Sequence, residues 1–168
     1  MILTITGTPG TGKTYLAKKL AKIAGMEYFD LNEYIKENRL YNGYDKKDKT
    51  YDVDVKKLEK LNKLFSRYHS KNPIMNKLVN KNINIKKIIS TTKKIKKSSG
   101  IIIDSHLSHY LDSDYCIVVK SDIKNINKVI KARNYGKKKI KDNIESEIFD
   151  ICLGEAKSLK RKILIVNN

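Results

Sequence analysis

The sequence predicts an α/β fold in three layers, with a central parallel five-stranded sheet between two layers of helices. Short apolar runs alternate along the chain with segments of helical periodicity, as in domains whose parallel strands are joined by helices. Some of these runs, such as residues 101–103, are apolar at every position, which is typical of strands buried on both faces. The 168 residues are enough for one domain of this kind, and no internal repeat interrupts them.

The expected elements follow from the spacing of apolar residues. Strands are expected at residues 2–6, 27–29, 101–104, 115–119 and 163–166, and helices at residues 15–24, 31–38, 55–68, 123–132 and 142–160. Gly25 is placed to end the first helix. Residues 71–100 are rich in Asn, Lys and Ile but have no clean period, so we expect a basic, partly helical excursion from the core.

Residues 7–14, GTPGTGKT, join the first expected strand to the first expected helix. The spacing Gly-x-x-x-x-Gly-Lys-Thr is that of a phosphate-binding loop, in which glycines let backbone N–H groups approach an anion at a helix N-terminus. In such a loop Lys13 reaches the β- and γ-phosphates and the Thr14 hydroxyl holds Mg²⁺. A glycine-rich turn that matches by chance is the alternative, but the flanking strand and helix both favour a phosphate site.

Asp104 follows an apolar run and is expected at the carboxyl end of a strand, where ligands of parallel sheets gather. A carboxylate at that place can position Mg²⁺ or its waters, although an Asp there can also simply cap a turn. His106, two residues further on, is a candidate for orienting an attacking water or a phosphate, with a structural role as the alternative. We expect a structural role for His109.

The segment KARNYGKKKIKDNIESEI brings Arg133 and several lysines after the helix expected at 123–132. A basic segment across the mouth of a phosphate site would exclude water and neutralise the charge that develops during phosphoryl transfer. A solvated basic loop is the alternative interpretation.

The chain has 36 Lys and Arg residues against 18 Asp and Glu residues, a net charge of +18. One interpretation of this excess is a compositional preference for lysine, which gives a solvated surface. The other is that the charge serves to bind a polyanionic partner such as RNA. Four of these residues are Arg and no aromatic-interleaved RNA-binding motif is present, so contact with RNA would be mainly with its phosphates and would depend on salt.

Other classes of protein fit the sequence less well. No apolar run is long enough to cross a bilayer and no signal segment is evident, so we expect a soluble cytoplasmic protein, or a nuclear one in a eukaryote. Cys116 and Cys152 lie in apolar or helical patterns and are expected to fill the core. The histidines and cysteines lack the spacing of metal ligands.

Four motifs occur in the same order and at similar spacing in one family: TGTPGTGKT, LYNGYD followed by YDVD, DSH, and ARNY followed by KIKDNIESEI. Over most of its length the chain therefore resembles the adenylate kinase isoenzyme 6 family, also called the coilin-interacting nuclear ATPase family. The resemblance implies a P-loop NTPase fold of the nucleoside monophosphate (NMP) kinase type, with an NMP-binding segment at about 30–53 and a lid at about 132–142.

The resemblance also implies an activity and partners. It implies adenylate kinase activity on ATP, with AMP or another NMP as acceptor, and an accompanying ATPase activity that needs Mg²⁺. It further implies a role in maturation of the small ribosomal subunit, through ribosomal protein uS11 on the pre-ribosome. The positive charge adds rRNA as an expected contact.

Carried over residue by residue, the site of the family falls on matching positions of this chain. The ATP site falls on Gly10, Gly12, Lys13, Thr14 and Tyr15, with Arg133 from the lid, and the Asp-x-His motif on Asp104 and His106. The chain departs from the family at four positions: Tyr15 replaces a second Thr, Lys36 and Val129 replace frequent Arg residues, and Asn134 replaces a usual Gly. Residues 71–100 also look like an insertion.

Two functions of different classes remain open. The first is a phosphotransferase, which the NMP-binding segment and the lid favour. The second is a ribosome-assembly ATPase with vestigial kinase activity, which Lys36 and Val129 favour because a lysine or a valine lacks the two-pronged grip of arginine on phosphate. A dephospho-CoA kinase or a shikimate kinase would not explain the DSH and LYNGYD motifs together.

Overall fold

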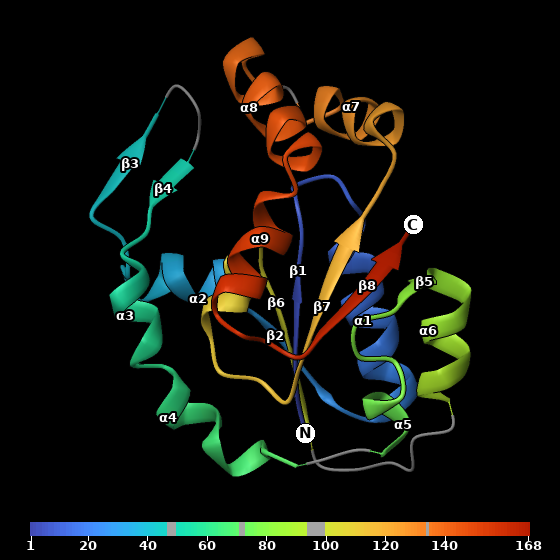
Figure 1. Ribbon diagram of the computed structural model, residues 1–168. Coiled ribbons are helices and arrows are strands. Elements are labelled where there is room, and N and C mark those ends of the chain that lie inside the picture. The colour runs from blue at the N-terminus through green and yellow to red at the C-terminus, as the bar shows by residue number, and fades with distance from the viewer. Residues whose placement is uncertain (47–49, 71–72, 94–99, 134) are drawn as a thin grey trace.

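The structure, a computed structural model, describes residues 1–46, 50–70, 73–93, 100–133 and 135–168 (Figure 1). Its centre is a parallel sheet with the strand order β2-β6-β1-β7-β8-β5. The α/β class with a central parallel sheet is confirmed, but the sheet has six strands rather than five. The additional strand, β5 (Asn82–Asn84), lies in the stretch where the sequence shows no clean period.

The central strand β1 is buried along its whole length and pairs with strands from the second half of the chain. The strands are β1 (Ile2–Thr6), β2 (Glu27–Asp30), β5 (Asn82–Asn84), β6 (Ile101–Asp104), β7 (Tyr115–Lys120) and β8 (Ile163–Asn167). Ile5 of β1 lies opposite Asp104 of β6, and Thr6 lies opposite Val118 of β7. The phosphate loop after β1 and the end of β6 therefore emerge at one edge of the sheet, called here the carboxyl edge.

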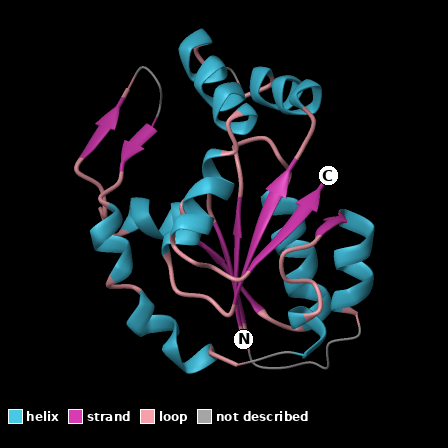
Figure 2. Cartoon of the chain, in the orientation of Figure 1, coloured by secondary structure: helices cyan, strands magenta, loops and turns pink. Residues whose placement is uncertain are grey.

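Helices cover both faces of the sheet, which gives the three layers that the sequence predicts (Figure 2). The helices are α1 (Lys13–Ala24), α2 (Leu31–Glu37), α3 (Val55–Glu59), α4 (Asn62–Phe65), α5 (Pro73–Asn76), α6 (Ile85–Thr92), α7 (Ile123–Lys131), α8 (Lys137–Ile148) and α9 (Ile151–Ser158), with short 3₁₀ turns η1 (Ser66–Tyr68) and η2 (Ser108–Tyr110). Leu3 and Ile5 pack with α1 on one face, whereas Ile2 packs with α2 and α3 on the other. In the described ranges, every helix is too short or too polar to cross a membrane.

Two expected helices are each divided in the structure. The helix expected at 142–160 is α8 followed by α9, because Asp150 adopts a left-handed conformation with φ 53° and interrupts the helical path. An ion pair with Lys120 holds the Asp150 side chain at this break. The helix expected at 55–68 is likewise divided into α3, α4 and η1.

Residues 73–92 belong to the core, so the expectation that they form an excursion from it is wrong. Met75, Leu78 and Ile88 are buried in the same apolar cluster as Leu16 and Leu20 of α1. Other apolar residues of the stretch, Val79, Ile83, Ile85 and Ile89, pack against the same cluster. Residues 94–99 of the expected excursion lie outside the described residues.

A two-stranded antiparallel hairpin, β3 (Gly43–Asp45) and β4 (Thr50–Asp52), stands apart from the main sheet (Figure 1). The ring of Tyr51 packs between two others, with centroids 4.5 Å from Tyr41 and 4.7 Å from Tyr44. This tyrosine cluster gives the hairpin an apolar interior of its own. The hairpin lies within residues 30–53, the segment to which the family resemblance assigns acceptor binding.

Candidate active site

The phosphate loop requires glycine for two different reasons. Gly12 is the N-cap of α1 with φ 90°, a left-handed conformation that costs glycine little because it has no Cβ. Gly7 has φ 140°, and a Cβ on it would overlap the carbonyl oxygen of Val119. The Thr11 hydroxyl donates to the Thr8 carbonyl at 2.9 Å and closes the turn. The backbone thus bends tightly just before the N-terminus of α1, where a helix dipole favours an anion.

Lys13, Thr14 and Asp104 come together at the carboxyl edge. Burial lowers the pKa of the half-buried Lys13, while the Asp104 carboxylate raises it. In return, burial raises the pKa of Asp104, while the Thr14 hydroxyl and the Lys13 charge lower it. The Asp104 carboxylate therefore interacts with a cation and a hydroxyl at the end of the phosphate loop.

The two oxygens of the buried Asp104 carboxylate differ in their surroundings. Oδ2 accepts a hydrogen bond from the Tyr28 hydroxyl at 3.2 Å. Oδ1 is buried, and within the described part of the chain no partner meets ordinary hydrogen-bond geometry there. A cation bound at Oδ1 would supply the interaction that ordinary hydrogen bonds do not. Because Mg²⁺ prefers carboxylate and hydroxyl oxygens, Asp104 and Thr14 are a fitting donor set for it.

Asp30 lies beside Asp104 at the matching position of strand β2. Its Oδ1 caps α2 by accepting hydrogen bonds from the backbone N–H groups of Asn32, at 3.0 Å, and Glu33, at 3.1 Å. The Ser105 hydroxyl donates to the Asn32 side chain at 2.8 Å. The start of α2, which opens the segment 30–53, is thus fixed directly to the end of β6.

The two histidines after Asp104 occupy different environments. The His106 side chain is exposed; the protein around it and the charge of Lys13 lower the pKa of His106, so its imidazole is neutral at pH 7. His109 is fully buried, with Nδ1 2.8 Å from the Thr6 hydroxyl and Nε2 3.0 Å from a carboxylate oxygen of Glu155 on α9. His106 is therefore free to meet a ligand at the carboxyl edge, whereas His109 connects the end of β1 to α9.

A pocket of about 650 Å³ adjoins the phosphate loop. Its lining comes from the loop, from α7 and from the ends of β7 and β8: Gly10, Gly12, Ser121, Asn125, Lys128, Val129, Ala132, Arg133 and Asn168. Arg133 is exposed, and its charge lowers the pKa of Lys13, so both cations face the same region. The volume lies within the range of small-molecule sites and suits a base and ribose next to the phosphates.

Not every position singled out in the sequence contributes a polar side chain to this site. The Tyr15 side chain is 59% exposed, and its hydroxyl accepts a hydrogen bond from Lys19 at 2.8 Å, so only the Tyr15 backbone is placed to meet a phosphate. Lys36 is exposed on α2, and Val129 adds an apolar side chain to the pocket. Asn134 lies outside the described residues.

Two residues at the site are missing from the sequence-based candidates. The Tyr28 hydroxyl contacts Asp104, and the Lys139 ammonium of α8 donates to the Thr50 hydroxyl of β4 at 2.7 Å. Tyr28 carries a usable signal, because it stands two positions before Asp30 in a strand and so shares its face. Lys139 carries none, since its contact depends on how α8 lies against the hairpin.

Comparisons with known proteins agree with this geometry. Residues 3–150 match an AAA domain. The "Putative adenylate kinase" of Methanocaldococcus jannaschii is 34% identical over 157 residues, which cover 94% of this chain and 72% of the relative. The "Adenylate kinase isoenzyme 6 homolog" of Schizosaccharomyces pombe is 32% identical over 165 residues, or 96% of this chain and 77% of the relative. A sugar kinase from Janibacter sp. HTCC2649 shares the fold, with a TM-score of 0.53 at 11% identity over 99% of this chain and 84% of that chain.

Proposed function

Since the chain belongs to the adenylate kinase isoenzyme 6 family and contains an AAA domain, we propose that it transfers the γ-phosphoryl group of ATP to AMP or another NMP. The observation that carries this proposal is the meeting of Asp104 with Lys13 and Thr14 at the end of the phosphate loop. The contact of α8 with the β3–β4 hairpin supports a cleft that closes over both nucleotides.

In the proposed reaction, the chain first holds the donor. The turn before α1 offers backbone N–H groups to the β- and γ-phosphates, and the pocket next to Arg133 takes the base and ribose. The phosphates favour the protonated form of Lys13 and so offset the effect of its burial. As the bond to the leaving oxygen breaks, Lys13 and Arg133 neutralise the charge that develops.

Thr14 and Asp104 are the residues that we propose hold Mg²⁺. The buried Oδ1 of Asp104, which has no hydrogen-bond partner of ordinary geometry among the described residues, and the nearby Thr14 hydroxyl support this assignment. When bound, Mg²⁺ neutralises phosphate oxygens and holds them in a fixed arrangement.

The acceptor is placed under residues 30–53 in this proposal, with residues 132–142, which include the start of α8, as the lid. A phosphate oxygen of the acceptor attacks in line when the hairpin and α8 hold it against the donor and exclude water. The neutral His106 imidazole stands at the same edge and is suited to orient a water molecule when no acceptor is bound. ATPase activity then follows from the same site.

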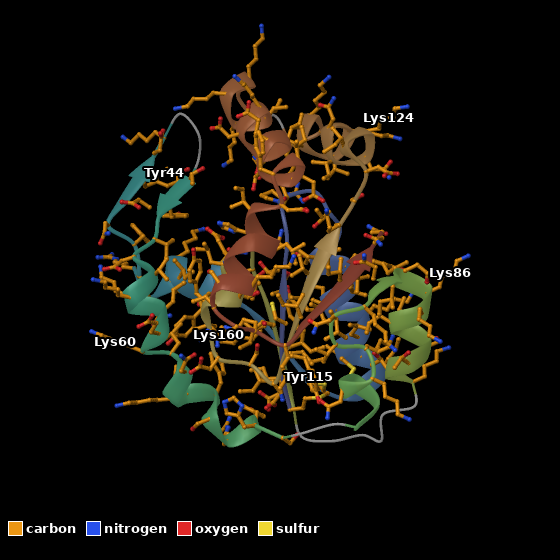
Figure 3. The ribbon with its side chains drawn as sticks, in the orientation of Figure 1. Tyr44, Lys60, Lys86, Tyr115, Lys124 and Lys160 are labelled. Atoms are coloured by element: carbon orange, nitrogen blue, oxygen red, sulfur yellow. The ribbon has the colours of Figure 1, made fainter. Side chains whose placement is uncertain are left out.

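A second candidate function is a ribosome-assembly ATPase with vestigial kinase activity. The net charge of +18 favours a polyanionic partner such as the small-subunit pre-ribosome, with uS11 and rRNA as the proposed contacts. Lys60, Lys86, Lys124 and Lys160 lie on different parts of the molecule (Figure 3). A partner bound through this charge would therefore use one of several basic surfaces.

A coupled assay of ATP turnover with and without AMP separates the two candidates. A phosphotransferase forms two ADP per ATP consumed, and AMP raises its rate well above the rate of hydrolysis. Hydrolysis that AMP leaves unchanged would contradict the kinase proposal and favour the assembly ATPase. Lys13→Ala in both arms shows that the measured rates belong to this site.

A further inference from the structure

We propose that Tyr28 is a positioning residue that orients Asp104 toward Mg²⁺ and joins this carboxylate to the start of the acceptor segment. The inference rests on the proposed function, because it assumes that Asp104 helps to hold Mg²⁺. The Tyr28 hydroxyl lies 3.2 Å from Oδ2 of Asp104 and 3.4 Å from Oδ2 of Asp30. A single phenol thus stands between two carboxylates.

The register of the sheet creates the need for such a bridge. Parallel pairing of β2 and β6 places Asp30 beside Asp104. Two neighbouring carboxylates repel each other, and Asp30 indeed raises the pKa of Asp104. Burial and the two carboxylates raise the pKa of Tyr28, so its hydroxyl keeps the proton that it shares between them.

The bridge determines which oxygen of Asp104 is available to a ligand. Tyr28 occupies Oδ2, which fixes the plane of the carboxylate. The other oxygen, Oδ1, is left buried without a hydrogen-bond partner of ordinary geometry among the described residues. Without the phenol, the carboxylate can rotate or turn Oδ2 toward the cation. The preorganised orientation of the metal ligand is then lost.

The same hydroxyl also reaches the acceptor side. Asp30 contacts Tyr28 through Oδ2 and caps α2 through Oδ1, which accepts from the N–H groups of Asn32 and Glu33. A change at the Asp104 carboxylate is therefore transmitted through Tyr28 and Asp30 to α2, the helix that opens residues 30–53. We expect Tyr28 to affect both Mg²⁺ affinity and the KM for AMP.

Removing only the hydroxyl leaves the ring in place. The Tyr28 ring packs against the apolar cluster of α1, and the Lys18 ammonium lies 5.3 Å from the ring centroid. Tyr28→Phe therefore tests the bridge and not the packing. Tyr68→Phe is a matched control, because the Tyr68 hydroxyl donates at 2.7 Å to Glu27 of the same strand without contacting Asp104.

The test measures Mn²⁺ binding to the protein in complex with ADP, by electron paramagnetic resonance, together with the KM for AMP at saturating Mg²⁺. Losing an outer hydrogen-bond partner of a metal ligand typically costs about 10-fold in metal affinity or more. We expect Tyr28→Phe to weaken Mn²⁺ binding by about this factor and to raise the KM for AMP, whereas Tyr68→Phe leaves both values at those of the wild type.

Asp104→Asn separates failure of the inference from failure of the proposed function. If Asp104→Asn weakens Mn²⁺ binding but Tyr28→Phe binds Mn²⁺ like the wild type, the positioning role is overturned and the kinase proposal stands. If Asp104→Asn itself binds Mn²⁺ normally, the metal role of Asp104 falls, and the inference falls with it.

Asp30→Asn tests whether the second carboxylate, rather than the phenol, acts on the cation. Asn caps helices as well as Asp does, so α2 is retained, and the Tyr28 hydroxyl then faces Asp104 as its one remaining carboxylate. We expect Mn²⁺ affinity within about twofold of the wild type, because the bridge to Asp104 persists. A loss of about tenfold would show that Asp30 itself holds the cation and would overturn the assignment to Tyr28.

Discussion

Lys139 of α8 donates a 2.7 Å hydrogen bond to the Thr50 hydroxyl of β4, although the two residues are 89 positions apart in the chain. The Lys139 ammonium also lies 4.4 Å from the ring centroid of Tyr135. One lysine thus connects the segment proposed as the lid to the hairpin proposed to cover the acceptor. It also acts on the neighbouring site, because its charge contributes to the lowered pKa of His106.

We expect Lys139→Ala to raise the KM for AMP by about 3- to 10-fold, the equivalent of one partly exposed hydrogen bond. Hydrolysis should rise relative to transfer, because a looser lid admits water. Steady-state kinetics with and without AMP measure both effects. Thr50→Val removes the same hydrogen bond but keeps the charge. If Thr50→Val behaves like the wild type while Lys139→Ala loses activity, Lys139 acts through its charge and not as a connection.

Lys13→Ala should abolish transfer and hydrolysis together while the fold persists. Stabilisation of developing charge by one such group is typically worth about a hundredfold or more. Lys13 is half-buried and its burial lowers its pKa, so replacing it removes a desolvated charge and leaves the core intact. Circular dichroism and the coupled assay test this, with the exposed Lys22→Ala of the same helix as control. Retention of more than about a tenth of either rate would contradict the assigned role.

His106→Ala should lower hydrolysis more than transfer to AMP. A bound acceptor brings its own nucleophile, whereas hydrolysis needs a water molecule that the neutral imidazole orients. The side chain is exposed and the backbone carbonyl still accepts from Thr6, so stability should change little. Initial rates of both reactions on the same preparation provide the ratio. Equal losses in both would show that the imidazole has a shared or structural role.

The buried His109 predicts a loss of stability in acid. Burial lowers the pKa of His109 in the folded protein below the ordinary 6.5. At pH values between the folded and the unfolded pKa, the unfolded chain therefore binds more protons than the folded one. The free energy of unfolding is therefore highest above pH 6.5 and falls as the pH decreases, by at most about 1.4 kcal/mol per pH unit for one proton. Urea unfolding between pH 7.5 and 5 measures this slope.

His109→Gln is the comparison that isolates this effect, because an amide can still bond to Thr6 but does not titrate. Its unfolding free energy should depend less steeply on pH over the same range. An unchanged slope would assign the acid sensitivity to other groups.

The lysines of α6 predict how the protein would bind RNA-containing particles. Lys86, Lys87 and Lys93 are exposed; the neighbouring lysines at 94, 96 and 97 lie outside the described residues. If α6 binds phosphates, changing the three lysines to Ser should weaken binding and flatten the log–log salt dependence by about 0.7–0.9 per lost contact. Filter binding at several salt concentrations measures the slope.

A matched triple change on α3 and α4, with Lys56, Lys60 and Lys63 replaced by Ser, removes the same charge from another part of the molecule. Kinase turnover should stay unchanged in both triple variants. Equal weakening by both would indicate a general charge effect, and no weakening by either would leave these lysines as a solvated surface.

The phosphate loop and its flanking elements could be predicted because contiguous residues define them. Residues 7–14 are contiguous, their glycines are needed for the backbone path itself, and the flanking strand and helix have clean periods. Asp104 follows three buried isoleucines, so its place at the carboxyl edge follows from the strand alone. Burial and a regular period carry this information without any knowledge of distant contacts.

The rest depends on contacts between distant residues, which no local pattern contains. The break between α8 and α9 at Asp150 is held by an ion pair with Lys120 of β7. Strand β5 has three residues, two of them Asn, and becomes a strand only through pairing with β8. Tyr28 gains its place at the site from the register of β2 with β6.

Strand β5 is synthesised before β6, β7 and β8, but it can join the sheet only after β8, the strand with which it pairs. Ile83 pairs with Val166, so the edge strand is made early but has no neighbour until the last strand of the sheet is in place. Closing so long a loop costs chain entropy before any contact repays it, which slows the step. Until then, Met75 and Ile88 have no finished sheet to cover, and a growing chain carries an uncovered apolar surface. The side of the domain around β5 and α6 is therefore the part most dependent on the presence of β8.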